Sequence, residues 1–188
     1  MARTELFRGY RSLTVGFSGV LALAAAALQP YLIEPENQLR GFLVLWLLVA
    51  SASLVMAAVQ LWRRVRRADS RLARQATLLA AEQFLPSVFV GAVVTLCVYR
   101  YAPDAAWMLP GLWSLIYSLG IFASYRLLPR QVAWVAMYYV ASGAACLIWG
   151  RGDQALAPWQ MAVCFGGGQI FGAAVLHWTL ERHDGSST

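Results

Sequence analysis

Charged residues are scarce in this sequence, and lysine is missing from it altogether. Of the 188 residues, 13% are charged and 60% are hydrophobic, whereas a soluble domain usually has about 25% charged residues. All 15 basic residues are arginine. So few charges exclude an ordinary water-soluble domain and indicate that lipid is the solvent for most of the chain.

Residues that hold metals, haem or disulfides are equally rare. There are two histidines and three cysteines, and neither a CxxC nor an HExxH motif occurs. A metal site needs three or four such ligands, so we expect no metal and no cofactor. We interpret Cys97, Cys146 and Cys164 as small buried hydrophobic residues. A Cys97–Cys146 bridge is an alternative, because these two lie at similar depth.

The sequence has instead six apolar stretches of about 20 residues, the length that a helix needs to cross ~30 Å of hydrocarbon. Lipid offers no partner for unpaired backbone groups, and no alternating barrel pattern is present, so the stretches predict helices. We expect an all-α polytopic membrane protein, a six-transmembrane-helix bundle in which residues 1–188 form a single domain. The first stretch is expected to be a span and not a cleaved leader, because its apolar run is long and further spans follow. The expected spans are residues 13–33, 41–62, 77–99, 105–125, 131–149 and 157–180.

Arginines are distributed unevenly between the two sides of these stretches. Arg40, Arg100 and Arg151 lie on one side, and the remaining twelve lie on the other. Because arginine-rich segments stay in the cytoplasm, this asymmetry predicts that both termini are cytoplasmic. The arginines responsible for the net charge of +6 lie beside the ends of the spans. The lipid bilayer is therefore an expected partner, and nucleic acid is not. The twelve are Arg3, Arg8, Arg11, Arg63, Arg64, Arg66, Arg67, Arg71, Arg74, Arg126, Arg130 and Arg182.

The densest group of charges lies at residues 63–76, which we expect to form a cytoplasmic loop after the second span. It contains Arg63, Arg64, Arg66, Arg67, Arg71 and Arg74. The simplest interpretation is a helix extension whose guanidinium groups contact lipid headgroups. Docking of an acidic partner protein is the alternative.

Polar residues inside the spans mark a candidate binding site, because burying them in lipid is costly and they are often functional. Glu82 precedes Pro86 by four residues, so the proline frees its carbonyl. Glu82 lies either in the inner leaflet or at the headgroups, and we favour the leaflet. Most of these polar side chains are expected at similar depth, in the cytoplasmic half of the spans. We therefore predict a pocket for a ligand or ion that opens toward the cytoplasm, with Arg126 at its rim. Its candidate residues are Glu82, Gln83, Tyr117, Tyr138, Tyr139, Gln169 and His177.

A run of glycines interrupts the last span. Gly166, Gly167 and Gly168 are consecutive, and Gly172 completes a GxxxG spacing with Gly168. Small residues at this spacing let two helix backbones approach closely, which predicts a tight contact within the protomer or across a homodimer. An unwound segment that lines a substrate cavity is the alternative.

Several short motifs resemble an uncharacterised group of bacterial six-span inner-membrane proteins. They are LPGLW at residues 109–113, YSLGIFAS at 117–124, LPR at 128–130, the Tyr138-Tyr139 pair and the FGGGQ of the last span. The resemblance extends from Glu82 to the end of the chain. It implies a multi-pass protein of the bacterial inner membrane, and no reaction, cofactor or catalytic residue.

The sequence therefore favours a non-enzymatic membrane protein, a sensor, regulator or accessory subunit. It would bind a small apolar ligand, a lipid or a partner protein, and the partner is a second copy or another membrane or cytoplasmic protein. A small dimeric transporter or channel with its pocket around Glu82 is one alternative. A membrane enzyme that acts on lipid or quinone through Glu82 and His177 is the other.

Overall fold

The computed structural model of the chain describes residues 2–67, 71–124 and 130–181, and these contain helices and short turns but no strand. Short 3-10 turns precede α2, α4 and α6. A single π-helical turn, Ala162–Gly167, separates α6 from α7. The α-helices are α1 (Ala2–Leu32), α2 (Gln38–Arg67), α3 (Arg71–Tyr101), α4 (Leu109–Ala123), α5 (Val132–Trp149), α6 (Pro158–Met161) and α7 (Gly168–Glu181).

Six of the helical segments are long and apolar enough to cross a membrane. The last of them combines α6, the π-helical turn and α7, and we call it the sixth span. The prediction of an all-α bundle with six span-length helices is therefore confirmed for the described residues. The apolar segments are Leu13–Leu32, Pro35–Arg63, Glu82–Tyr101, Pro103–Ala123, Val132–Trp149 and Pro158–Thr179.

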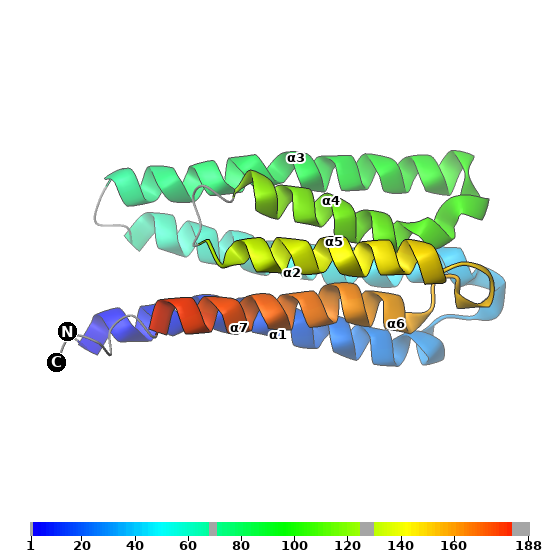
Figure 1. Cartoon of the computed structure of the whole chain (residues 1–188), viewed down its shortest axis with the longest axis horizontal. Coiled ribbons are helices and arrows are strands. Elements are labelled where there is room, and N and C mark those ends of the chain that lie inside the picture. The colour runs from blue at the N-terminus through cyan, green and yellow to red at the C-terminus, as the bar shows by residue number, and fades with distance from the viewer. Residues whose placement is uncertain (1, 68–70, 125–129, 182–188) are drawn as a thin grey trace.

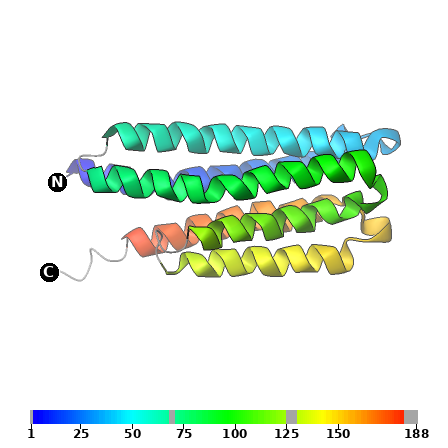
Figure 2. The same ribbon diagram turned by 90° about the horizontal axis from the view of Figure 1, so that it is seen from above.

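Successive spans run in opposite directions, so the start of α1 and the end of α7 lie at the same end of the bundle (Figures 1 and 2). The connections that lead into α2, α4 and α6 gather at the other end (Figure 1). The most extensive contacts join α4 with α5 and α1 with α7, followed by α3 with α4. In contrast, α2 and α3 contact each other only slightly.

Small residues explain the closest of these contacts. A Cβ atom built on Gly143 of α5 would lie 2.9 Å from the carbonyl oxygen of Gly111 in α4. One built on Gly19 of α1 would lie 2.9 Å from Cγ1 of Ile170 in α7. Side chains at these glycines would hold the helices apart, and packing of small residues is what associates helices in lipid.

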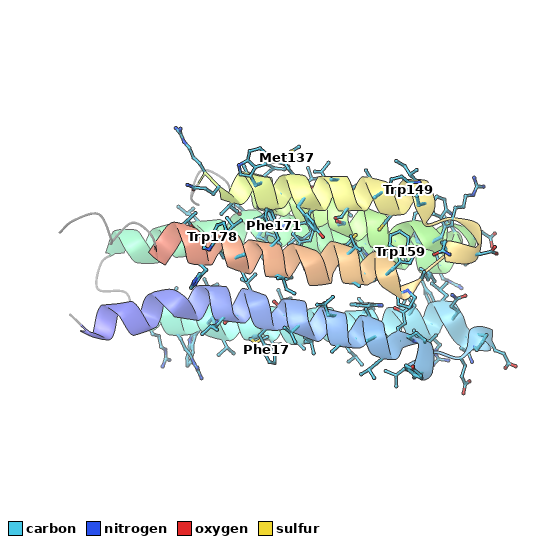
Figure 3. The ribbon with its side chains drawn as sticks, turned by 60° about the horizontal axis from the view of Figure 1, so that its bottom comes forward. Phe17, Met137, Trp149, Trp159, Phe171 and Trp178 are labelled. Carbon is cyan, nitrogen blue, oxygen red and sulfur yellow. The ribbon has the colours of Figure 1, made fainter. Side chains whose placement is uncertain are left out.

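The outer faces of the bundle are strongly apolar. In the most apolar 18-residue stretch of each span, 17% of the second span and 6% of the third are buried inside the protein. The corresponding share is 39% in both the fourth and the fifth span. Phe17 on α1 and Met137 and Trp149 on α5 point away from the bundle (Figure 3). Such faces suit contact with lipid.

The helices depart from one expectation about local structure. The segment at residues 63–76, expected as a loop, is helical on both sides of residues 68–70, because α2 runs to Arg67 and α3 begins at Arg71. Pro110 occupies the first turn of α4, where its missing N–H costs little. The helix α3 continues through Pro86.

A buried glutamine joins three elements at the connection-rich end. Gln29 of α1 donates from Nε2 to the carbonyl of Leu156 at 2.7 Å, and its Oε1 accepts from Nε1 of Trp46 in α2 at 2.9 Å. Leu156 has a φ of 57°, a left-handed conformation that costs roughly 1–3 kcal/mol in a non-glycine residue. Its burial in the core beside Phe42 and Met161 and the bond from Gln29 hold it there.

We predict that Gln29→Leu lowers the free energy of unfolding by about 2–4 kcal/mol, because it leaves the Trp46 N–H and the Leu156 carbonyl without partners. Gln38→Leu is the matched control, since Gln38 donates to Ala155 over 3.3 Å at an exposed position. We expect it to cost less than about 0.5 kcal/mol. Thermal unfolding in detergent measures both, and equal melting temperatures for the two variants would contradict the role given to Gln29.

Candidate functional site

Aromatic rings from four elements meet in the half of the bundle where α4, α5 and the sixth span pack together. The central ring is Tyr117 of α4, whose centroid lies 4.7 Å from that of Tyr139 in α5 and 5.1 Å from that of Phe84 in α3. Ring pairs at such distances are attractive in tilted and edge-to-face arrangements. We call this group the aromatic cluster; its members are Phe84, Tyr117, Tyr138, Tyr139, Phe165 and Phe171.

The three tyrosine hydroxyls of the cluster differ in their partners. The hydroxyl of Tyr117 accepts from Nε2 of Gln169 at 3.1 Å. That of Tyr138 donates to the carbonyl of Val163 at 2.8 Å. The hydroxyl of Tyr139, a residue only 1% exposed, has no hydrogen-bond partner among the described residues. A buried hydroxyl without a partner is uncommon and costs about 1–3 kcal/mol.

The π-helical turn gives the sixth span its shape beside the cluster. A π-helical turn widens the helix and displaces carbonyl groups from the α-helical pattern, and such turns are frequent at functional sites. Here Tyr138 bonds the carbonyl of Val163, a residue of that turn. Phe165, in the same turn, packs edge-to-face against Tyr117 and in a tilted arrangement against Tyr139, with ring centroids 5.8 and 5.9 Å away. The turn therefore supplies both a ring and a carbonyl to the cluster.

Each glycine of the sixth span faces a neighbour within the same chain. A Cβ on Gly166 would collide with Leu23 of α1, and one on Gly167 with the hydroxyl of Tyr138. On Gly168 it would lie 2.5 Å from Cζ of Tyr139. A Cβ on Gly172 would have more room, because its nearest neighbours are side-chain atoms of Val135 and Val15 at 3.5 and 3.6 Å. The glycines thus make room for α1 and for the two tyrosines of α5.

The structure brings together four of the seven residues that depth alone assigned to a pocket. Tyr117, Tyr138, Tyr139 and Gln169 are in contact or share hydrogen bonds. The other three, Glu82, Gln83 and His177, are exposed on the surfaces of α3 and α7. Glu82 is the first residue of the apolar segment of α3. The position of Arg126, expected at the rim, lies outside the described residues.

The basic segment is described only in part. Arg63 is exposed, and the guanidinium of Arg66 lies 3.9 Å from the centroid of the Trp62 ring, a cation–π contact. The side chains of Arg64, Arg67, Arg71 and Arg74 lie outside the described part of the structure.

Sequence reasoning missed a pair of buried sulfur atoms. Sγ of Cys146 in α5 lies 3.4 Å from Sγ of Cys164 in the π-helical turn, while Cys97 is exposed on α3. The neighbour of Cys146 is thus Cys164 and not Cys97. The sequence gives their similar depth, because the two residues lie at similar distances from the connection between consecutive antiparallel spans. It does not give which sides of the two helices face each other.

No model of a known protein family matches the chain, and neither a curated protein nor a solved structure is similar to it. No group of three or more His, Cys, Asp or Glu side chains that could hold a metal occurs within residues 2–67, 71–124 and 130–181. The aromatic cluster and its polar neighbours are therefore the candidate functional site.

We predict opposite effects for alanine at the two glycines of the GxxxG pair. Gly168→Ala forces the buried ring of Tyr139 to shift, which costs about 1–3 kcal/mol of stability. Gly172→Ala meets only ordinary contacts and gains helix propensity of about 1 kcal/mol or less. Thermal unfolding in detergent compares them. Destabilisation by both to the same extent would show that helix spacing, rather than the Tyr139 contact, is what the glycines serve.

Proposed function

We propose that the protein is a non-enzymatic integral membrane sensor, regulator or accessory subunit that binds a small apolar molecule or lipid chain at the aromatic cluster. The observation that carries this proposal is the hydroxyl of Tyr139, buried and without a partner among the described residues. The rings around it offer apolar contact, and the hydroxyl offers one hydrogen bond. Sites of this kind are lined by aromatic side chains and a few polar groups that fix orientation.

The exposed positions of Glu82 and His177 support this choice over an enzyme acting on lipid or quinone. A general acid or base has to lie within hydrogen-bond reach of the reacting group. Both side chains lie on the surface, on different helices, whereas the polar groups near the cluster are hydroxyls, an amide and backbone carbonyls. Groups of this kind orient a bound ligand through hydrogen bonds.

A small transporter is the second candidate, and the π-helical turn favours it. Transporters often bind substrate at an irregular segment of a spanning helix, and this turn interrupts the sixth span beside the cluster. The carbonyl of Val163 in this turn already accepts a hydrogen bond from Tyr138 within the protein, and for this reason we rank transport second. Flux of the bound molecule into vesicles that contain the pure protein would reverse this order.

We expect Tyr139→Phe and Tyr117→Phe to change stability in opposite directions. Tyr139→Phe removes a buried hydroxyl that has no partner, so the ligand-free protein should gain up to about 1 kcal/mol. Tyr117→Phe deprives the amide of Gln169 of its acceptor and should cost about 1 kcal/mol. Thermal unfolding of the delipidated protein in detergent measures both differences.

The same variants test binding by native mass spectrometry of protein extracted gently from its own membrane. The wild type should retain a small bound mass that Tyr139→Phe loses. Tyr101→Phe, at a residue 82% exposed, is the control and should retain it. A Tyr139→Phe protein that keeps the same adduct would rule out the cluster as its binding site.

We further propose that the protein lies in a bacterial inner membrane with both termini in the cytoplasm. The arginine asymmetry supports this orientation, as does the shared end of the bundle at which α1 starts and α7 ends (Figure 1). The helix α2 also ends there (Figure 1), and Arg63 and Arg66 belong to its last turns.

Reporter fusions test this topology. A fluorescent protein that matures only in the cytoplasm should be bright at either terminus, and alkaline phosphatase should be inactive there. Insertion of the phosphatase after Asp153, between α5 and α6, should make it active. Phosphatase activity at either terminus would contradict the proposed orientation.

A further inference from the structure

The two buried cysteines are close enough to react with each other. Their Sγ atoms lie 3.4 Å apart, and a disulfide bond measures about 2.05 Å, so closing the gap takes a movement of about 1.4 Å. Cys146 is 1% exposed and Cys164 is fully buried. Each thiol thus has the other as its reaction partner and is shielded from bulky reagents.

Two serine hydroxyls, from Ser114 in α4 and Ser142 in α5, bond to the backbone of α5 in the same packed part of the core. Ser114 donates to the carbonyl of Tyr139 at 2.8 Å and lies 3.2 Å from the hydroxyl of Ser142. Ser142 in turn donates to the same carbonyl at 3.3 Å. Sγ of Cys146 also lies 3.9 Å from the carbonyl oxygen of Gln160, so the core around the pair contains polar as well as apolar groups.

The π-helical turn supplies the freedom for the movement. Cys164 lies in the middle of the turn, Ala162–Gly167, while Cys146 lies within the regular helix α5. A π-helical turn interrupts the regular i→i+4 hydrogen bonds of an α-helix with a rare i→i+5 pattern. A shift of its backbone toward α5 is therefore easier than the same shift in an ordinary helix.

We propose that Cys146 and Cys164 form a dithiol site that a peroxide oxidises to a disulfide. In the first step one thiolate attacks the O–O bond of hydrogen peroxide and becomes a sulfenic acid, with release of hydroxide that takes up the thiol proton to give water. In the second step the other thiol displaces the sulfenic hydroxyl as a second water and closes the S–S bond. Two thiols thus supply the two electrons that reduce one peroxide to two waters.

Burial selects the oxidant for this site. Quinones and glutathione disulfide are too large to reach sulfur atoms that are almost fully covered by protein, whereas hydrogen peroxide is close to water in size. Once one sulfur is oxidised, the second is already in contact with it. The closing step is then intramolecular and has a large effective concentration.

The test uses the full-length protein in isolated membranes, treated with hydrogen peroxide and then denatured in the presence of a maleimide-polyethylene glycol reagent. The reduced protein has three cysteines and should gain three tags. After peroxide it should gain one, at Cys97, and its intact mass should fall by two hydrogens. Trypsin cleaves after Arg151, between the two cysteines, so the disulfide should appear as a linked pair of peptides that a reductant separates.

Single variants assign the reaction. In Cys97→Ser the loss of two tags should persist, because the exposed cysteine takes no part. In Cys146→Ser the linked peptides should vanish, and a sulfenic acid at Cys164 should be trapped when the protein is denatured in the presence of dimedone. Three tags on the peroxide-treated wild type would overturn the proposal, and so would independent sulfinic acids at the two cysteines without linked peptides.

Discussion

The bundle depends on helix backbones that come close to one another, because apolar side chains that pack together in lipid gain little over their contact with acyl chains. Glycine provides this closeness at the main contacts. Gly111 and Gly143 let α4 and α5 approach, and Gly166 and Gly168 let the sixth span settle against α1 and α5. The contacts that lack such residues, above all α2 with α3, are slight. The molecule therefore has a tightly packed part around α4, α5 and the sixth span, and an outer layer with large apolar surfaces.

Close approach has a second consequence, since it leaves each polar group in the packed part dependent on partners from the same few residues. Hydroxyls, amides and carbonyls there bond across helices, as Gln169 does to Tyr117 and Ser114 to Tyr139. Among the described residues, two buried side-chain oxygens have no hydrogen-bond partner. They are the hydroxyl of Tyr139 and Oε1 of Gln160. Gln160 lies near the connections at the end of the bundle, and its amide nitrogen bonds the carbonyl of Gln154. Of these two oxygens, only the hydroxyl of Tyr139 lies within a cluster of aromatic rings.

The sequence could predict the helices and the depth of the polar residues, because both follow from position along the chain. Twenty apolar residues predict a span wherever they occur, and depth alone singled out Tyr117, Tyr138, Tyr139 and Gln169. What depth cannot supply is the rotation of each helix about its axis, which depends on packing against neighbours. Glu82 and His177 share the depth range of the tyrosines but face outward. The Cys146–Cys164 pair and the contribution of Phe165 were missed for the same reason, and the π-helical turn has no pattern in the sequence that distinguishes it from a glycine-rich α-helix.

The π-helical turn connects the two features to which we assign a role, since three consecutive residues of it belong to them. Val163 accepts the hydrogen bond of Tyr138, Cys164 faces Cys146, and Phe165 packs in the aromatic cluster. A disulfide that draws Cys164 toward α5 moves its two neighbours as well, because they share its backbone. A 2.8 Å hydrogen bond cannot stretch by more than a few tenths of an ångström and persist, so Tyr138 has to follow Val163 or release it. Either response changes the rings around Tyr139. A ligand held by those rings and an oxidant at the sulfur pair would then act on one shared element, which is the physical requirement for coupling between two sites.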